Sequence, residues 1–443
     1  MEIKKKVLIL MLLVCIVGKI SVVAAADSFE YVIYTPENTT SNNQSQTTKL
    51  SQLLAEYELF STDVSQVKNQ YMLNISNSTL ANEKKQDSYD YVGELESGMS
   101  YIKNVKTELL KLKKELQEEY DSYNQSKEKY KERLGEIEKG IQEIDYQVAV
   151  LQEQLNTGTS SLDSASSSYR EAVLNASLNK FYSENKQCIL DYEIEQLKFG
   201  VVKNLLNMMV LKEQKSYYNS YENLLDVQII IEEKKVKLGL VNQTGLEKLE
   251  IERSSNTSSI RTCNNTYQLI YNSIARDTMN KNSKYVLEYT ESSKGYKEED
   301  LVYAFILKNP QLIQLKYYIN AYTDYMGDLT SESSKTQIKY MINGYDIQRT
   351  ILINDIRQYV NVAYTDYKEA VLNLSTSQSE IIYYSKQYNA VVKKYNLGRA
   401  TQLEVKKAEV NKQNAYVKYY GILQEKLLLE YILDNHIYNG DYK

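Results

Sequence analysis

The side chains that most often carry catalysis are scarce in this chain and are not arranged in catalytic patterns. The 443 residues include one histidine, His436, near the C-terminal end, and three cysteines. Aspartate and glutamate are plentiful, but they recur at the spacing of a helix surface. The sequence has no Cys/His metal-ligand spacing, no glycine-rich phosphate loop and no nucleophile elbow. We therefore expect no enzyme, no catalytic residue, no bound metal and no cofactor, with His436 a solvated terminal residue.

The cysteines do not form the pattern of a disulfide framework. Cys15 lies in the N-terminal apolar stretch, which leaves Cys188 and Cys263 in the remainder of the chain. If the chain turns near Asn242 in a straight helical hairpin, these two cysteines lie roughly 50 Å apart at about 1.5 Å per residue. Bridged Cα atoms lie within about 7 Å of each other, so we expect no intrachain disulfide.

The first 26 residues have the composition of a secretory signal peptide. Lys4–Lys6 form a basic start, Val7–Val17 an apolar stretch and Ala24–Ala26 a small-residue cleavage site. Lys19 interrupts the apolar stretch before it reaches a membrane-spanning length, and a retained anchor is the alternative. Later segments lack a run of about 18 to 20 apolar residues. We expect an exported protein of the cell envelope, in the outer membrane if the source has one and otherwise at the cell surface or extracellular.

Composition narrows the fold class and the kinds of partner. The formal net charge is −5, from 53 Lys and Arg against 58 Asp and Glu, so the surface charge is mixed. A mixed surface argues against nucleic acid as a main partner. Only 2 prolines and 15 glycines interrupt the chain. Because both residues break helices, their scarcity predicts an all-α protein with little or no β-strand.

Two long segments place apolar residues in alternating steps of three and four. The first runs from Ile102 to Leu155, with charged residues at most other positions, and predicts a coiled coil. The second runs from Ile353 to Tyr395, about six heptads or roughly 70 Å of helix. An isolated helix of this length cannot bury its apolar seam, so we expect antiparallel helical hairpins that need one another or another chain. The segment after the second run repeats Ala408, Ala415, Ile422 and Leu429.

Each half of the chain contains a helix–turn–helix that breaks at a glycine. One turn is expected near 239–245 and the other near 398–401. Superposing Gly239 on Gly398, an offset of 159 residues (398 − 239), aligns Val201 with Val360 and Cys263 with Ile422. Duplicated hairpins in an exported chain predict the wall of a tube or stalk.

These patterns predict the organisation of the whole chain. Residues 157–168 are expected to be a loop, 301–326 one helix, and 327–348 a polar connection with one short strand near 338–342. The predicted segments are a signal peptide at 1–26, a flexible leader at 27–48, a first helical repeat at 49–275 that includes the coiled coil at 102–155, a linker at 276–299, a second helical repeat at 300–435 and a tail at 436–443.

The residues at the two turns resemble the tip signature of the TolC family of outer-membrane efflux proteins. The segment 395–405, followed by Ala408, is similar to that signature, and 238–249 resembles a degraded copy. Asn309 and Pro310 are similar to the Asn-Pro motif that opens a repeat in this family. The turn residues that carry the resemblance are Leu238, Gly239, Thr244, Leu397, Gly398, Arg399 and Thr401.

The resemblance implies a homotrimer whose hairpins form a hollow helical barrel. It also implies that the glycine turns form the tip where a periplasmic adaptor docks, next to an inner-membrane transporter. Glu404 occupies the family position of an entrance constriction, but Lys407 and Gly245 stand where the family often has further acids. The family also inserts two β-hairpins per subunit. The segment 327–348 is too short for one of them and 102–155 has helical periodicity, so we expect that barrel to be reduced or absent.

The function that follows from the resemblance is a passive efflux or export duct of the cell envelope. The alternative is an exported structural coiled-coil protein of the cell surface without transport activity, which shares the same periodicity. The sequence identifies neither a substrate nor a particular pump, and membrane contact stays open.

Overall fold

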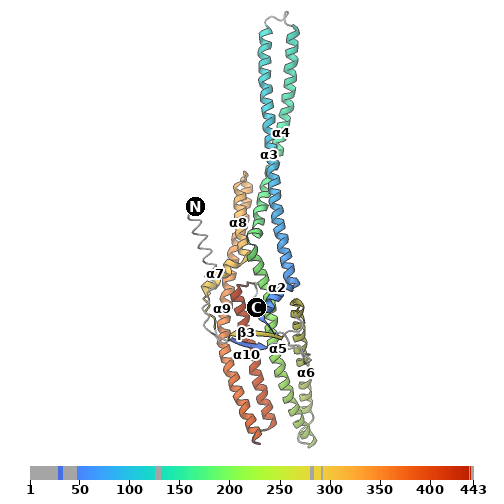
Figure 1. Cartoon of the computed structure of the whole chain (residues 1–443), viewed down its shortest axis with the longest axis vertical. Coiled ribbons are helices and arrows are strands. Elements are labelled where there is room, and N and C mark those ends of the chain that lie inside the picture. The colour runs from blue at the N-terminus through green and yellow to red at the C-terminus, as the bar shows by residue number, and fades with distance from the viewer. Residues whose placement is uncertain are drawn as a thin grey trace. The chain divides into compact units, whose positions relative to one another are not determined.

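The computed structural model describes residues 28–32, 47–124, 131–279, 284–290, 293–438 and 440. Within these residues the chain is almost entirely helical, and most helices are long and paired (Figure 1). The predicted all-α class with little β-strand is confirmed. The predicted signal peptide at 1–26 lies outside the described residues.

The chain folds into two compact units. Unit 1 comprises the described parts of Met1–Gln66, Glu193–Phe305 and Ile356–Lys443, and unit 2 comprises those of Val67–Tyr192 and Ile306–Asp355. Each unit therefore combines segments from both halves of the sequence. The compact units differ in this respect from the repeats at 49–275 and 300–435 that the sequence pattern suggests.

Unit 1 is built on two helical hairpins. Its long helices are α5 (Lys186–Lys237), α6 (Thr244–Asp277), α9 (Glu332–Asn396) and α10 (Gln402–Asn435), with the short α2 (Leu50–Phe60) beside them. The first parts of α5 and α9 belong to unit 2.

Pairs of side chains show that α9 and α10 are antiparallel. Lys418 Nζ lies 2.9 Å from Glu380 Oε2, and Tyr367 Oη donates to Glu430 Oε1 at 3.1 Å. In both pairs the two residues stand at nearly equal distances along the chain from Gly398. The predicted hairpin of residues 350–397 and 401–434, with Gly398 at its turn, is confirmed.

The second hairpin has the same construction and packs beside the first. Arg253 Nε lies 2.8 Å from Asp226 Oδ1 across α5 and α6. Tyr431 on α10 donates to Glu195 on α5 at 2.8 Å, and its ring stacks on Phe199. The helices therefore lie in the order α9, α10, α5, α6 (Figure 1), which confirms that the 191–274 hairpin packs alongside.

A three-stranded sheet in unit 1 joins segments that are far apart in the sequence. β1 (Ser28–Val32) pairs antiparallel with β3 (Lys284–Thr290), and β2 (Thr47–Lys49) pairs parallel with β3. Tyr285, Val286 and Leu287 of the central strand are buried. The predicted flexible leader at 27–48 and linker at 276–299 thus contain the strands of this sheet. The sheet as a whole was not predicted, because each strand is short and its partner is remote in the sequence.

Unit 2 contains a helical hairpin where one continuous coiled coil was predicted. α3 (Thr62–Asn124) and α4 (Lys131–Glu184) are antiparallel. Arg133 Nη2 lies 2.9 Å from Glu119 Oε1, and Lys113 pairs with Asp145 further along. The prediction of one continuous segment at 102–155 is therefore wrong, since α3 ends at Asn124 and α4 begins at Lys131.

The serine-rich stretch 157–168 is helical, and not the predicted loop. Gly158 lets α3 and α4 approach closely, because a Cβ there would lie 3.3 Å from Met99 Cγ. The hydroxyls of Thr159, Ser161 and Ser168 bond to the carbonyl four residues before each of them. These bonds satisfy the polar side chains within the helix, so the stretch needs no loop.

The Asn-Pro motif ends one helix and starts the next. α7 (Glu298–Lys308) stops before Asn309, whose Oδ1 accepts from the Leu312 backbone N–H at 3.1 Å, and α8 (Pro310–Gly327) follows. The predicted single helix 301–326 is therefore broken at the residue before proline. The predicted connection 327–348 is also wrong beyond its first residues, because α9 begins at Glu332 and Tyr345 packs on Tyr318 and Tyr322 of α8.

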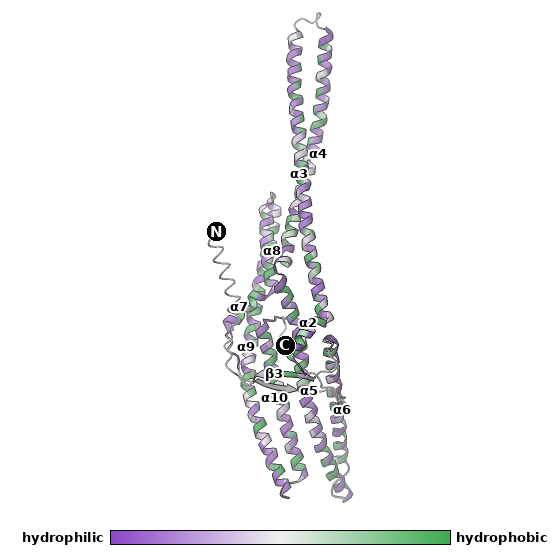
Figure 2. Ribbon diagram, in the orientation of Figure 1, coloured by the Kyte–Doolittle hydropathy of each residue, from purple (hydrophilic) through white to green (hydrophobic). Residues whose placement is uncertain are grey.

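Hydrophobic and hydrophilic residues alternate along every long helix (Figure 2). None of the helices in the described residues has an apolar stretch long enough to cross a membrane. Cys188 and Cys263 are both free thiols.

The C-terminal segment after α10 packs into unit 1. The His436 ring lies edge-on to Phe305 at 5.4 Å, and Ile437 is buried. The Tyr438 carbonyl accepts from Gln196 Nε2 at 3.2 Å. The interpretation of His436 as a solvated residue is therefore wrong.

We predict that Asn309→Ala destabilises unit 2 by about 1 kcal/mol, because the Leu312 backbone N–H loses its acceptor at a buried helix start. Asn309→Ser is the matched control, since serine is also a good N-cap. Urea denaturation followed by circular dichroism measures both variants. Equal loss in both would contradict a capping role.

Candidate functional site

The two glycine turns have the same backbone geometry. At the first, the Leu240 N–H donates to the Lys235 carbonyl and the Gly239 N–H to the Val236 carbonyl, both at 2.9 Å. At the second, the equivalent bonds join Arg399 to Lys394 at 2.8 Å and Gly398 to Tyr395 at 2.9 Å. This is the Schellman motif that ends helices at a left-handed residue.

Glycine is needed at both turns for a backbone reason. Gly239 has φ +66° and Gly398 has φ +69°, values that cost other residues steric strain. A Cβ at either position would meet no atom of the described chain within 4 Å. The requirement therefore comes from the left-handed backbone and not from crowding.

The two turns differ in how the return helix begins. Thr401 and Glu404 form a capping box, in which the Glu404 N–H donates to Thr401 Oγ1 at 3.2 Å and the Thr401 N–H donates to Glu404 Oε2 at 2.6 Å. At the first turn, Gln243 precedes α6 without a side-chain cap, and Thr244 is the first helical residue. The return helix α10 thus has a side-chain cap that the return helix α6 lacks.

Glu404 has a structural role at the start of α10. Bonds from the Thr401 backbone and hydroxyl lower the pKa of its carboxyl, and Lys394 and Lys407 act in the same direction more weakly. The side chain is exposed. Its carboxylate therefore remains charged at neutral pH and closes the capping box.

An exposed leucine stands immediately before each turn glycine. Leu238 is 72% exposed and Leu397 is 69% exposed. The 159-residue offset that superposes the glycines also superposes these two leucines (397 − 238). Arg399 and Thr401 follow on the second turn. The structure thus places the predicted turn residues at the ends of two equivalent hairpins, whereas Asn309 and Pro310 form a helix start in unit 2.

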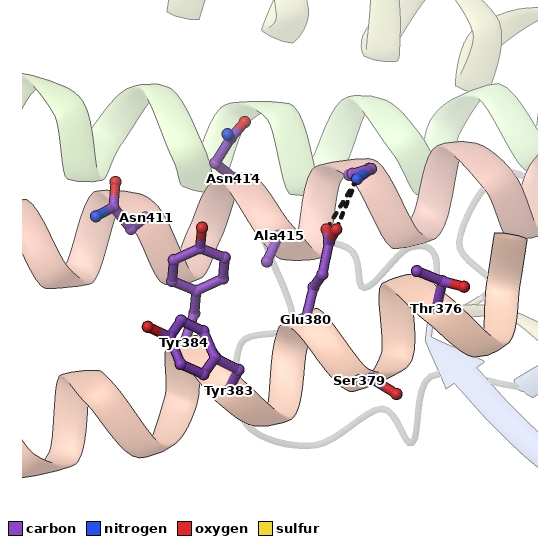
Figure 3. Close-up of a pocket in the computed structure, with 9 residues that line it drawn as sticks. Thr376, Ser379, Glu380, Tyr383, Tyr384, Asn411, Asn414 and Ala415 are labelled. Carbon is purple, nitrogen blue, oxygen red and sulfur yellow. Dashed lines mark hydrogen bonds and ion pairs between the residues drawn. The ribbon is translucent and has the colours of Figure 1, made fainter.

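A groove of about 510 Å³ runs between α9 and α10 (Figure 3). Thr376, Ser379 and Tyr383 line it from α9, and Asn411 and Ala415 from α10. Across it, Glu380 is paired with Lys418. These side chains do not form a nucleophile–base pair. Among the described residues, no group of His, Cys, Asp and Glu is arranged to hold a metal ion.

A buried polar network in unit 1 was not predicted. Lys426 is fully buried and its Nζ donates to Glu430 Oε1 at 2.7 Å. Glu430 Oε1 also accepts from Tyr367, whose hydroxyl oxygen accepts from the Lys294 N–H at 2.7 Å. These bonds fix the segment that follows β3 onto α9 and α10.

A second set of bonds continues the network at the end of α10. Tyr296 Oη donates to Asp434 Oδ1 at 2.7 Å, and Lys294 Nζ lies 2.5 Å from Asp434 Oδ2. Burial, followed by the bond to Asp434, raises the pKa of Tyr296. Burial likewise raises the pKa of Tyr367 to about 12. Both hydroxyls therefore stay protonated and donate at physiological pH. In the sequence, Lys426 and Glu430 match an ordinary surface pair four residues apart, so only their heptad position could have indicated burial.

We predict that Gly398→Ala lowers the free energy of unfolding by about 1 kcal/mol, because alanine is strained in the left-handed region. Gly421→Ala is the matched control. Its Cβ would also meet no atom of the described chain within 4 Å, but Gly421 lies inside α10. There, alanine should stabilise by about 0.5–1 kcal/mol. Chemical denaturation that gave the two variants the same sign would contradict this account.

We predict that Lys426→Met destabilises unit 1 by about 3 kcal/mol or more, because Glu430 would keep a buried charge without its partner. The double variant Lys426→Met/Glu430→Gln removes that charge and keeps an acceptor for Tyr367. It should therefore recover most of the loss in urea denaturation. A double variant as unstable as the single one would show that the pair is not a coupled buried charge.

No family model and no curated protein matches the chain. Among solved structures, it is similar to the outer membrane protein VceC from Vibrio cholerae at 9% identity and a TM-score of 0.41, over 61% of this chain and 75% of that one. It is similar to the CmeC outer membrane channel of Campylobacter jejuni at 11% identity and a TM-score of 0.38, over 60% and 67% of the two chains. For CusC the identity is 10% and the TM-score 0.44, over 93% and 99%. The solved structures similar to this chain thus include outer-membrane channels of the TolC family.

Proposed function

We propose that this protein is a duct component of the cell envelope, through which an inner-membrane transporter exports its substrate. The observation that carries the proposal is the pair of equivalent hairpin ends. Each has a Schellman turn at a left-handed glycine and an exposed leucine just before it. An exposed leucine repeated at equivalent turns is available for contact with a partner.

The partner proposed for these turns is a periplasmic adaptor that bridges the duct and its transporter. Leu238 and Leu397 would supply apolar anchors, and Arg399 and Thr401 would supply polar contacts around the second anchor. Small apolar contacts with a polar rim are the usual composition of such interfaces. The functional assembly in this proposal is a homotrimer, located in the outer membrane if the source has one.

Glu404 is proposed as part of an entrance constriction in addition to its role in the capping box. The two roles can be separated by substitution. Glu404→Gln keeps an oxygen that accepts from Thr401 but removes the negative charge, whereas Glu404→Ala removes both. A role for the charge therefore requires that both variants alter transport.

The alternative function is a structural coiled-coil protein of the cell surface. The long α3–α4 hairpin of unit 2 supports it, since a rod of this kind suits a spacer. It does not account for the exposed leucines that recur at both glycine turns.

We predict that Leu238→Ser/Leu397→Ser raises the accumulation of exported dyes in source cells as much as deletion of the chain does. The physical reason is loss of both apolar anchors at the docking end. The matched control is Leu59→Ser, which replaces a leucine that is 71% exposed on α2 and should leave accumulation unchanged. Accumulation of a panel of fluorescent dyes is the measurement.

The outcomes separate the two functions. If deletion leaves the accumulation of every dye unchanged but weakens the envelope, the structural alternative holds and the duct does not. If deletion raises accumulation and the double serine variant does not, transport stands but docking at the turns is wrong.

A further inference from the structure

The α3–α4 hairpin of unit 2 extends beyond the helix that covers its base. At the base, α8 packs on α4, where the rings of Tyr317 and Phe181 lie 5.8 Å apart. Further along, Figure 1 shows α3 and α4 side by side, with no third helix of the described part of unit 2 next to them. The seam between them buries Leu134, Ile137 and Ile144. Two paired helices bury only that seam, so their other sides stay open to solvent.

Bonds between the two helices occupy one side of this hairpin. Tyr120 Oη donates to Glu138 Oε1 at 2.6 Å, and Lys113 pairs with Asp145, seven residues further along α4 (145 − 138). Leu110 lies three residues before Lys113 (113 − 110), so it is next to this donor on the helix surface. The side of α3 that carries Leu110 is therefore the side with polar bonds to α4.

A groove of about 510 Å³ follows a different side of α3. Leu112 lines it and Leu110 does not. The two leucines are two residues apart, which places them about 200° apart around the helix. The groove therefore lies away from the side that holds the polar bonds to α4.

The residues along the groove have the spacing of a helix-binding face. They follow one another in steps of four and three: Tyr101, Val105, Glu108, Leu112 and Glu115. Tyr101 is 71% and Leu112 46% exposed, and Val105 is half-buried. Apolar side chains in alternating steps of three and four meet another helix in coiled coils. This side of α3 thus has the pattern of a contact surface for a further helix.

The charges of the groove indicate which kind of helix fits. Glu108 and Glu115 line it, seven residues apart, against one lysine among the lining residues, Lys111. Glu94, which is exposed, continues the same line toward the base of the hairpin (108 − 94 = 14). Two copies of this face would each present a line of glutamates, and like charges across an interface are unfavourable. A helix with basic residues along the facing line is complementary instead.

We propose that this groove binds an amphipathic helix of another protein. That helix carries leucine-like residues against Val105 and Leu112, and lysine or arginine against the line of Glu108 and Glu115. Burial of the apolar residues supplies affinity, and the charge pairs select the partner and its register. The inference concerns unit 2 alone and does not depend on the proposed duct or on docking at the glycine turns.

A designed peptide tests the groove directly. The probe is a fluorescent helical peptide of about 28 residues, since shorter helices are marginal in water. It carries leucines and lysines on two adjacent lines with heptad spacing, and its matched control has glutamate in place of every lysine. Fluorescence anisotropy measures binding to the purified full chain. We expect the lysine peptide to bind at least about tenfold more tightly than the glutamate peptide.

A pair of leucine variants locates the site. Leu112→Lys should weaken binding of the lysine peptide at least about tenfold, because it removes an apolar contact and adds a like charge. Leu110→Lys is the matched control: both leucines are 46% exposed on the same helix, and both changes add one positive charge. It should bind the peptide as the unmodified chain does.

Reversal of the groove charges should exchange the preference. In Glu108→Lys/Glu115→Lys, the glutamate peptide should bind more tightly than the lysine peptide, because the facing line is now basic. Circular dichroism establishes that each variant keeps its helix content.

Four outcomes would overturn the proposal. They are no binding of the lysine peptide to the unmodified chain at about 100 μM, equal binding of the two peptides, equal loss in Leu110→Lys and Leu112→Lys, and a dimer of the unmodified chain that Leu112→Lys alone abolishes. The last result would assign the groove to a second copy. Dye export plays no part in these measurements, so failure of the duct proposal and failure of this one remain distinguishable.

Discussion

Reversal of the chain at the end of a long helix is the constraint on which the rest of this structure depends. Two helices share an apolar seam only if the chain turns back within a few residues, without leaving the last carbonyls of the first helix unsatisfied. The Schellman bonds at Gly239 and Gly398 meet both conditions. They require a left-handed residue, which explains the glycine at each turn. The same local solution, used twice, makes the two hairpin ends equivalent and gives the proposed docking end its shape.

Once the chain has turned, the register of the helices has to be held along their length. Apolar heptads alone allow a slip of one repeat, whereas a buried polar group allows only the position where it is paired. Asn256 donates to the Tyr218 carbonyl across α5 and α6 at 2.9 Å, and Tyr367 of α9 donates to Glu430 of α10 at 3.1 Å. A slip would leave these groups buried without partners. These buried bonds therefore fix the register of the two helices in each hairpin. The register in turn fixes the position of the exposed leucine at the end of that hairpin.

Sequence reasoning succeeded where the structure depends on local pattern. The heptads from Ile353 to Tyr395 and the glycine at 398 identified a helix, its turn and its antiparallel return. The same reasoning failed where a tertiary contact outweighs local preference. The serine-rich stretch 157–168 is helical and Gly158 lies against Met99 there, while 332–348 is helical and Tyr345 packs on α8. The heptads of 102–155 were recognised correctly, but periodicity is the same in a continuous rod and in a hairpin.

What the sequence determined by itself is the helical class, the two glycine turns and the leucine that precedes each one, since all three follow from neighbouring residues. What only the tertiary structure decided is which helices are neighbours, the sheet that joins residues 28–32 to 284–290, and the burial of Lys426 with Glu430. Those features depend on residues far apart in the chain, and a lysine four residues from a glutamate has the same local pattern whether water or protein surrounds it.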